Sequence, residues 1–296
     1  MQITFLGTSS MVPTKERNQI AVFLSYDSEG ILFDCGEGTQ RQFKIAGISL
    51  TKITKILISH WHGDHVLGLP GSIQSLSSMD YKDRLEIYGP AGTKKRMDKM
   101  FEAFVFDKRL SFVVKEIKSG IFFENNEFQL EAYELEHGIE TLGYRFIEKD
   151  KRKIDMKKVK KLNIPIGHLL GKLQQGKTIE NNGEKISPED VTYVEAGKNI
   201  AYITDTLLCD NCYRIADNVD LLICEATYSS KLVDKSEEYG HMTAKQAAQI
   251  ANKSNTKQLV LIHFSARYKN TQELEEDARD IFDNVICAKD FMRINL

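Results

Sequence analysis

Ile58-Ser59-His60-Trp61-His62-Gly63-Asp64-His65 carries three histidines and one aspartate within six positions. The segment follows the apolar run 55–58, which is typical of a buried strand, and a helix is expected from Val66 onward. Alternate residues of an extended chain project to the same side, so His60 and His62 can bind one metal ion together. We therefore interpret the segment as a metal-binding loop at the carboxyl end of a strand.

The second half of this loop is expected to serve a second metal position. Gly63 permits a sharp turn, which directs Asp64 and His65 toward a point next to the one bound by His60 and His62. Imidazole and carboxylate ligands suit Zn²⁺, and they also accept Mn²⁺ or Fe²⁺. The loop therefore predicts a site for divalent metal without selecting one ion.

Two metal ions need more ligands than this loop supplies, and three further candidates follow apolar runs. His137 follows 128–135, Asp205 closes 200–204 and His263 closes 258–262. A carboxylate can bridge two cations, whereas an imidazole cannot. The predicted ligand sets are His60, His62, His137 and Asp205 for one ion, and Asp64, His65, His263 and Asp205 for the other.

Length and composition are those of a folded protein outside the membrane. The chain has 296 residues, is 42% apolar and 28% charged, and carries a formal charge of −2. No apolar run approaches the ~18 residues of a membrane span, and residues 1–7 alternate like a strand instead of a signal peptide. Five scattered cysteines indicate reduced thiols, so we expect a cytoplasmic protein without membrane contact.

Short β-branched runs recur along the chain and predict its strands. They cover 2–6, 20–25, 30–34, 55–59, 85–88, 112–117, 128–135, 142–147, 199–204, 220–225, 258–263 and 292–295. Helices are expected over 92–106, 243–254 and 271–283. The pattern favours one α/β (layered α+β) domain over residues 1–296, with two mixed sheets between outer helices.

Residues 149–183 break this pattern and are predicted to form an inserted flexible arm. Between 149 and 161 the chain has eight basic and two acidic residues, a net charge of +6, and four glycines follow. Such a stretch is too polar to bury and too rich in glycine to be one regular element. A solvated, charged surface hairpin is the alternative interpretation.

Several blocks of the sequence resemble one family. The His-x-His-x-Asp-His run, with the later His, Asp and His, is similar to the metallo-β-lactamase superfamily, which implies an αββα sandwich with two zinc ions. Five further blocks resemble the short form of the tRNase Z family, the tRNA 3′-processing endoribonucleases. These blocks are Pro13–Asn18, Phe33–Gln40, Thr204–Thr206, Cys224–Thr227 and His263–Tyr268. The resemblance covers residues 1–295.

This resemblance implies an endoribonuclease that removes the 3′ trailer of precursor tRNA and leaves a 3′-hydroxyl on the tRNA and a 5′-phosphate on the trailer. A hydroxide bridging the metals would attack the phosphodiester, and Asp64 would hold or deprotonate that water. The implied proton donor to the leaving oxygen is His241, supported by Glu225. Asp34 is expected to orient a histidine ligand by accepting a ring N–H, with a plain turn carboxylate as the alternative.

RNA contacts are expected from two regions. Lys15 and Arg17 lie in an N-terminal loop, and Arg267 follows the ligand His263. The arm is expected to contribute Lys151, Arg152, Lys153 and Lys172. In the family the arm holds the tRNA elbow and serves the active site of the other subunit, which implies a homodimer.

The sequence departs from the family at two places and leaves two other functions to weigh. Gly167-His168 stands where family arms often carry Gly-Pro, and Cys224 stands where a histidine is common. A dinuclear phosphodiesterase for small or cyclic nucleotides would use the same metals but would not need the basic arm. An RNA-binding module with structural zinc would not need His241.

One short motif has no part in these predictions. Cys209-x-x-Cys212 lacks a second cysteine pair or nearby histidines, so a zinc ribbon is not expected there. We interpret the spacing as a coincidence within a helix.

Overall fold

The computed structural model describes residues 1–79, 81–105 and 109–296. The chain divides into two compact units. The main unit comprises Met1–Phe123, Leu130–Phe146 and Asn199–Leu296, and the insert unit comprises Glu124–Gln129 and Ile147–Lys198. Within the described residues, no helix is long and apolar enough to cross a membrane.

The first sheet begins with antiparallel strands and continues with parallel ones. Over the described ranges its order is β18 (Arg293–Asn295), β1 (Gln2–Gly7), β2 (Ala21–Tyr26), β3 (Glu29–Phe33), β4 (Lys55–Leu57), β5 (Leu85–Gly89) and β6 (Phe112–Glu116). The strands from β18 to β3 pair antiparallel, and those from β3 to β6 pair parallel. The parallel part brings the carboxyl ends of β3 and β4 to one edge.

The second sheet has a parallel half of the same kind. In the part of the chain that is described, its order is β17 (Val285–Cys287), β16 (Leu259–Ile262), β15 (Leu221–Glu225), β14 (Asn199–Ile203), β9 (Glu140–Glu148), β8 (Phe128–Glu136) and β7 (Gly120–Glu124). The strands β14 to β17 pair parallel and are almost entirely buried, as continuous apolar runs require. Asp205 lies just beyond the carboxyl end of β14, Glu225 is the last residue of β15, and His263 directly follows β16.

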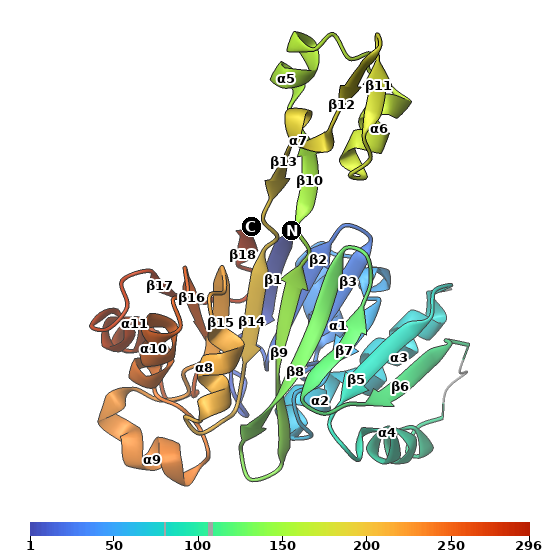
Figure 1. Cartoon of the computed structure of the whole chain (residues 1–296). Coiled ribbons are helices and arrows are strands. Elements are labelled where there is room, and N and C mark those ends of the chain that lie inside the picture. The colour runs from blue at the N-terminus through green and yellow to red at the C-terminus, as the bar shows by residue number, and fades with distance from the viewer. Residues whose placement is uncertain (80, 106–108) are drawn as a thin grey trace. The chain divides into compact units, whose positions relative to one another are not determined.

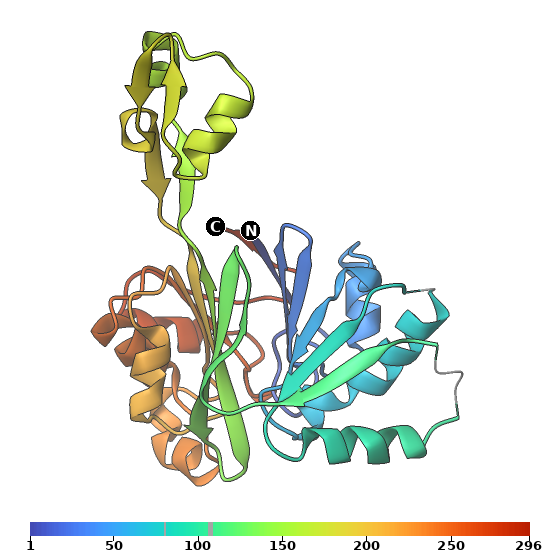
Figure 2. The same ribbon diagram turned by 45° about the vertical axis from the view of Figure 1, so that its right-hand side comes forward.

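Helices cover the outer face of each sheet in the main unit, as Figures 1 and 2 show. The first sheet is covered by α1 (Thr39–Ile45), α3 (Gly68–Ser78) and α4 (Thr93–Glu102), and the second by α8 (Asp210–Ala216), α10 (Ala244–Lys253) and α11 (Gln272–Arg279). Between the sheets, the Phe33 ring stacks on Tyr202 with centroids 5.0 Å apart, and Tyr26 meets Phe146 at 5.2 Å. The predicted αββα layering is confirmed.

Sequence patterns located strands better than helices. The twelve predicted runs all overlap strands of the structure, whereas β7, β17 and the four short strands of the insert unit were not predicted. Helix α4 ends at Glu102 and not at 106, a residue outside the described ones. Helix α3 lies where a helix was expected from Val66 onward, although Gly68, Pro70 and Gly71 are unusual residues within a helix. A Cβ on Gly68 would lie 2.0 Å from the Gly36 carbonyl oxygen, so this helix packs too closely for any other residue there.

The insert unit has a small hydrophobic core of its own. Strand β10 (Lys151–Ile154) pairs antiparallel with β13 (Thr192–Glu195), and β11 (Ile179–Asn181) pairs with β12 (Glu184–Ile186). The short helices are α5 (Met156–Lys161), α6 (His168–Gln174) and α7 (Pro188–Val191). The core consists of Val159, Ile164, Leu173, Ile179, Ile186 and Val191. The unit extends to Lys198, beyond the arm range 149–183 drawn from composition, because β13 is the partner that β10 requires.

Candidate metal centre

The site is built from the loops that follow the carboxyl ends of strands. Asp34 follows β3, Asp205 follows β14 by one residue, and His263 follows β16. These three residues have positive φ angles of 55°, 35° and 61°. Such angles are uncommon for residues other than glycine and cluster at functional sites, where the surrounding structure holds the strain. The backbone therefore turns sharply at each strand end and aims a polar side chain at the sheet edge.

The His-x-His-x-Asp-His loop begins slightly earlier than expected and then enters a short helix. Strand β4 ends at Leu57, so His60 and His62 lie in the loop beyond it. The one-turn helix α2 (Gly63–Val66) begins directly after His62. The chain turns at Gly63 without a positive φ there, and Asp64 and His65 join the second group, as expected. The start of α2 redirects the chain and separates Asp64 and His65 from the first two histidines.

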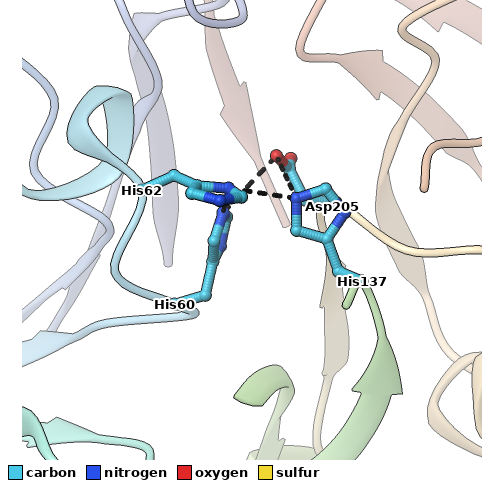
Figure 3. Close-up of side chains that lie close together, drawn as sticks. All are labelled: His60, His62, His137 and Asp205. Atoms are coloured by element: carbon cyan, nitrogen blue, oxygen red, sulfur yellow. Dashed lines mark hydrogen bonds and ion pairs between the residues drawn. The ribbon is translucent and has the colours of Figure 1, made fainter. Parts of the chain in front are cut away.

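The first group of side chains consists of His60, His62, His137 and Asp205 (Figure 3). The Nδ1 atom of His62 lies 3.0 Å from His60 Nε2 and 3.1 Å from His137 Nε2. Asp205 Oδ2 lies 3.6 Å from the Nε2 atoms of both His60 and His137. These ligand atoms come from three loops and converge on one point.

The second group consists of Asp64, His65, Asp205 and His263. Asp64 Oδ2 lies 3.4 Å from the Nε2 atoms of His65 and His263. Asp205 contributes Oδ2 at 3.3 Å from His65 Nε2 and Oδ1 at 3.1 Å from His263 Nε2. Asp205 is thus the member common to both groups, and the two groups have the same members as the two ligand sets expected from the sequence.

The donor set fits divalent metal ions. Asp64 Oδ1 and His65 Nε2 are buried and have no hydrogen-bond partner among the described residues. The outer ring nitrogens are already occupied: His65 Nδ1 lies 2.8 Å from Asp34 Oδ2, and His137 Nδ1 lies 2.7 Å from the Gly240 carbonyl oxygen. A ring that donates its outer N–H presents an inner lone pair, which is the form that binds a metal. The cluster is therefore a divalent-metal site.

The protonation states of His60 and Asp205 favour the binding of cations. Burial and the neighbouring histidines lower the pKa of His60 well below its usual value, so its imidazole stays neutral. Burial alone would raise the pKa of Asp205, but His263 and His65 outweigh it and hold the pKa well below the usual range. The shared carboxylate is therefore ionised.

Asp34 accepts hydrogen bonds from several donors at once. The backbone N–H of Ser59 donates to Oδ1 at 2.7 Å, and the Ser59 hydroxyl, the His65 ring and the Tyr202 hydroxyl lie 2.8, 2.8 and 2.9 Å from Oδ2. The carboxylate is fully buried. Nothing in the sequence indicated that Tyr202 would contact Asp34, because Tyr202 lies in the apolar run of β14. Its side chain reaches from the second sheet to Asp34.

His241 lies beside the second group and contacts Glu225. Its Nδ1 atom is 3.3 Å from both carboxylate oxygens of Glu225 and 4.0 Å from Asp205 Oδ2. Burial opposes protonation, but Glu225 and Asp205 outweigh it and raise the pKa of His241 to about 9. Cys224, the departure from the family pattern, is a residue of β15 with its side chain buried in the core, and it does not prevent this contact.

Two threonines that the sequence did not single out complete the surroundings of Glu225. The Thr206 backbone N–H donates to Oε1 at 2.7 Å, and the Thr227 hydroxyl donates to Oε2 at 2.6 Å. The Thr227 hydroxyl also lies 2.9 Å from His263 Nδ1. Thr227 therefore connects the carboxylate that holds His241 with a member of the second group.

A pocket of about 300 Å³ opens at the cluster. Besides members of the two groups it is lined by His241, by Ser10 and Met11 of the N-terminal loop, and by Tyr228 and Tyr239. Met11 and Tyr239 are exposed large side chains. The metal site is therefore open to a substrate group on one side.

The basic residues expected near this pocket differ in exposure. Lys15 is exposed. Arg17 is buried, and its Nη2 donates to the Tyr268 carbonyl oxygen at 2.6 Å. The exposed Arg267 guanidinium stacks 5.1 Å from the centre of the Tyr228 ring. Arg17 thus joins the N-terminal loop to the loop after His263.

The basic residues expected on the arm are also divided. Lys151, Arg152 and Lys153 are partly buried and form ion pairs with Glu148, Glu189 and Glu195 at 2.9, 3.3 and 3.6 Å. Lys172 on α6 is exposed, and so are the lysines of α5, namely Lys157, Lys158, Lys160 and Lys161. The lysines of α5 therefore present more accessible positive charge than the strand residues do.

The chain is similar in sequence to known families and proteins over its whole length. A family model described as a beta-lactamase superfamily domain matches residues 180–264, and one described as anti-Pycsar protein Apyc1 matches residues 1–151. Ribonuclease Z of Protochlamydia amoebophila is 40% identical over 99% of this chain and 98% of its own length. The chain belongs to the ribonuclease Z family. Ribonuclease Z of Methanothermobacter thermautotrophicus is 37% identical over 100% of this chain and 97% of its own length.

Solved structures agree with this assignment. The short form of human tRNase Z aligns with a TM-score of 0.74 at 29% identity and covers 100% of this chain and 99% of its own. The predicted family and the metallo-β-lactamase fold are thus confirmed. As a ribonuclease Z, the protein is an endoribonuclease that acts on tRNA, and its cluster of histidines and aspartates is a divalent-metal site.

Proposed function

We propose that this ribonuclease Z cuts the 3′ trailer from precursor tRNA, leaving a 3′-hydroxyl on the tRNA and a 5′-phosphate on the trailer, with two Zn²⁺ ions per subunit. The observation that carries the proposal is the pair of four-residue groups joined by Asp205. Four ligands of imidazole and carboxylate type suit Zn²⁺, and Mn²⁺ or Fe²⁺ would bind the same donors.

The proposed ligands are His60, His62, His137 and Asp205 for one ion, and Asp64, His65, His263 and Asp205 for the other. Two divalent ions supply an activated water at neutral pH and stabilise negative charge on a phosphoryl group. Asp34 holds the ring of His65 in the orientation that binding requires, because it accepts the outer N–H.

Two side chains of the protein handle protons in this proposal. Asp64 Oδ1 has no hydrogen-bond partner among the residues described and is free to accept a proton from the attacking water. His241 is protonated at neutral pH because its pKa is raised to about 9, and it donates that proton to the leaving 3′-oxygen. Glu225 keeps His241 oriented through contacts of 3.3 Å.

The insert unit is proposed to bind the tRNA body away from the cut. Its exposed lysines on α5, with Lys172, provide charge that attracts phosphates of any sequence. Lys151, Arg152 and Lys153 are proposed to add to this field from β10. Lys15, Arg17 and Arg267 are proposed to contribute to binding near the 3′ end of the tRNA. Arg17 would act indirectly, because its hydrogen bond to the Tyr268 carbonyl oxygen fixes the position of the N-terminal loop.

A chelator experiment tests the catalytic proposal. A 3′-extended precursor tRNA is incubated with the zinc-loaded protein, with and without a chelator, and the ends of both products are mapped. Chelator-sensitive cleavage with a 3′-hydroxyl on the tRNA and a 5′-phosphate on the trailer is expected. Cleavage that continues after complete metal removal, or a 3′-phosphate on the tRNA, contradicts it.

The insert unit is best removed at the base of β10 and β13. Lys151 faces Glu195 across this pair, and the Gly197 N–H donates to Asp150 Oδ1 at 2.9 Å, so a short Gly-Ser linker can replace residues 150–197. A cut over 150–180 would leave Ile186 and Val191 without their core partners. The expected result is loss of precursor tRNA binding with retained hydrolysis of a small phosphodiester. Equal loss of both activities contradicts separate roles.

A homodimer in the cytoplasm, with each insert unit serving the partner's metal site, completes the proposal. A mixing experiment tests it: the variant without the insert unit is combined with His241→Ala. Each alone is expected to be inactive on precursor tRNA, and the mixture is expected to regain cleavage. A mixture as inactive as its components, or a monomer in light scattering, contradicts the shared arrangement.

The alternative is a dinuclear phosphodiesterase for small or cyclic nucleotides. It would use the same two groups of metal ligands. The basic insert unit argues against it, because a small substrate needs no second, positively charged binding element. Faster turnover of a cyclic nucleotide than of precursor tRNA at equal concentration would favour the alternative.

A further inference from the structure

Cys209 and Cys212 form a thiol pair that the metal site does not use. Their sulfur atoms lie 3.6 Å apart. Cys209 is partly exposed and directly precedes α8, whereas Cys212 is buried on the inner face of that helix. The distance is short enough that a small change of side-chain torsion brings the sulfurs to the ~2.05 Å of a disulfide.

The surroundings of the pair distinguish an attacking sulfur from a resolving one. The two thiols are within hydrogen-bond distance of each other, and the Cys212 thiol donates to the Leu207 carbonyl oxygen at 3.8 Å. The contact with Cys212 and the backbone N–H groups of Asn211 and Cys212 outweigh burial and lower the pKa of Cys209 to about 6, while the pKa of Cys212 is raised. The thiolate therefore forms on the accessible sulfur, as in reactive Cys-x-x-Cys pairs.

A cavity of about 490 Å³ adjoins Cys209 and gives a reagent access to its sulfur. Its lining includes three acidic side chains, Glu134, Glu136 and Asp210, and one basic side chain, Arg214. The excess of negative charge favours a cationic or neutral reagent over an anionic one. The other cysteines, Cys35, Cys224 and Cys287, are buried and have raised pKa values, so they are poor competitors.

We propose that Cys209 and Cys212 form a redox-active dithiol site that reacts with small cationic disulfides by thiol–disulfide exchange. The Cys209 thiolate attacks one sulfur of the reagent, which forms a mixed disulfide and releases one thiolate. Cys212 then loses its proton, and its sulfur attacks the Cys209 sulfur and releases the second thiolate. The protein pair is oxidised by two electrons, and the reagent disulfide is reduced to two thiols.

The test uses the zinc-loaded full chain, with cystamine as the cationic probe and oxidised glutathione as the anionic one. Wild-type protein is expected to lose two hydrogens in mass, to yield a Cys209–Cys212 disulfide on peptide mapping, and to recover with dithiothreitol. Cystamine is expected to react at least about tenfold faster than oxidised glutathione. Cys212→Ser is expected to stop at a mixed disulfide on Cys209, and Cys209→Ser is expected not to react.

Three outcomes overturn the proposal. One is a mixed disulfide on Cys209 that persists in the wild type, because Cys212 then does not resolve it. Another is faster modification of Cys35, Cys224 or Cys287. The third is an equal or higher rate with oxidised glutathione, which removes the role of the acidic cavity. None of these results depends on tRNA cleavage, so they leave the proposed function untouched.

Discussion

Replacing His241 by alanine removes the proposed proton donor while leaving the two ligand groups intact. We expect kcat for precursor tRNA to fall by roughly 10²–10⁴-fold, the usual contribution of a general acid. The zinc content, measured by elemental analysis, is expected to stay at the wild-type value, because His241 is not a proposed ligand.

His168→Ala is the matched control, since His168 lies at the start of α6 in the insert unit and is exposed. Its kcat for precursor tRNA is expected to equal that of the wild type, because His168 belongs to neither ligand group. Loss of zinc from His241→Ala would mean that this histidine acts as a ligand, and the assignment of a proton donor would fail.

Asp34 offers a second prediction at the scale of one residue. Asp34→Ala leaves the Ser59 hydroxyl, the Tyr202 hydroxyl and the outer nitrogen of His65 without their acceptor. Zinc affinity, measured by competition with a coloured chelator, is expected to fall about 10–100-fold. Tyr202→Phe removes one donor and keeps the carboxylate, so its affinity should change much less. An equal loss in the two variants would contradict the orienting role of Asp34.

The titration of Asp290 is expected to make the free energy of unfolding depend on pH. Asp290 accepts from the Thr8 hydroxyl, the Asn18 N–H and the Gln42 amide, yet burial raises its pKa to about 6 from 3.8. Because the folded pKa is the higher one, its stabilising effect is complete below pH 3.8 and is lost as the pH rises through 6.

The Asp290→Asn variant isolates this effect, since it cannot titrate. The free energy of unfolding of the wild type, minus that of Asp290→Asn, should fall by roughly 2 kcal/mol between pH 4 and pH 7. Urea titrations at several pH values measure this difference, and any constant cost of the asparagine cancels. A difference that is flat or rises with pH would contradict the raised pKa.

At the scale of elements, α5 is the part of the insert unit whose charge is most accessible. Replacing Lys157, Lys158 and Lys161 by glutamine should weaken precursor tRNA binding and reduce the slope of log affinity against log salt by about 2–3. Glutamine preserves helix propensity, so the helix is expected to remain. Filter binding across a salt series measures both quantities.

The matched control replaces Lys94, Lys95 and Lys99, which are exposed on α4 of the main unit, by glutamine. The same loss of charge there is expected to change affinity far less. If the two triple variants weaken binding equally, the insert unit has no special role and only net charge matters.

The elements also explain how far the sequence could be read. Strands β14, β15 and β16 are continuous apolar runs that end in polar residues, so both the strands and Asp205 and His263 could be predicted. The hydrogen bonds that Tyr202 and Thr227 make at the site could not be predicted, because they join residues that are far apart in the sequence. Burial of Arg17 was equally hidden, since its partner Tyr268 is distant in sequence. Helix ends were harder to predict: the helix expected over 271–283 spans only Gln272–Arg279.

For the whole molecule, the metal ions are expected to contribute to folding. The seven proposed ligands come from loops of both sheets, so the ions bind the folded main unit and not the unfolded chain. At a free zinc concentration of 100 times Kd, binding adds about 2.7 kcal/mol per ion to the free energy of unfolding. Chelation should therefore lower Tm, and added zinc should restore it. An unchanged Tm, with metal loss verified by elemental analysis, would contradict this coupling.

The positive φ angles at Asp205 and His263 limit how this enzyme can vary. Each position must satisfy a coordination requirement and a backbone requirement at once, and few amino acids meet both. Glycine at position 263 would relax the backbone, by about 1–3 kcal/mol, while deleting a ligand. In a population under selection for stability alone, such replacements would spread and activity would be lost. Inactive descendants of this family should therefore carry glycine or asparagine at these strand ends before they lose their cores.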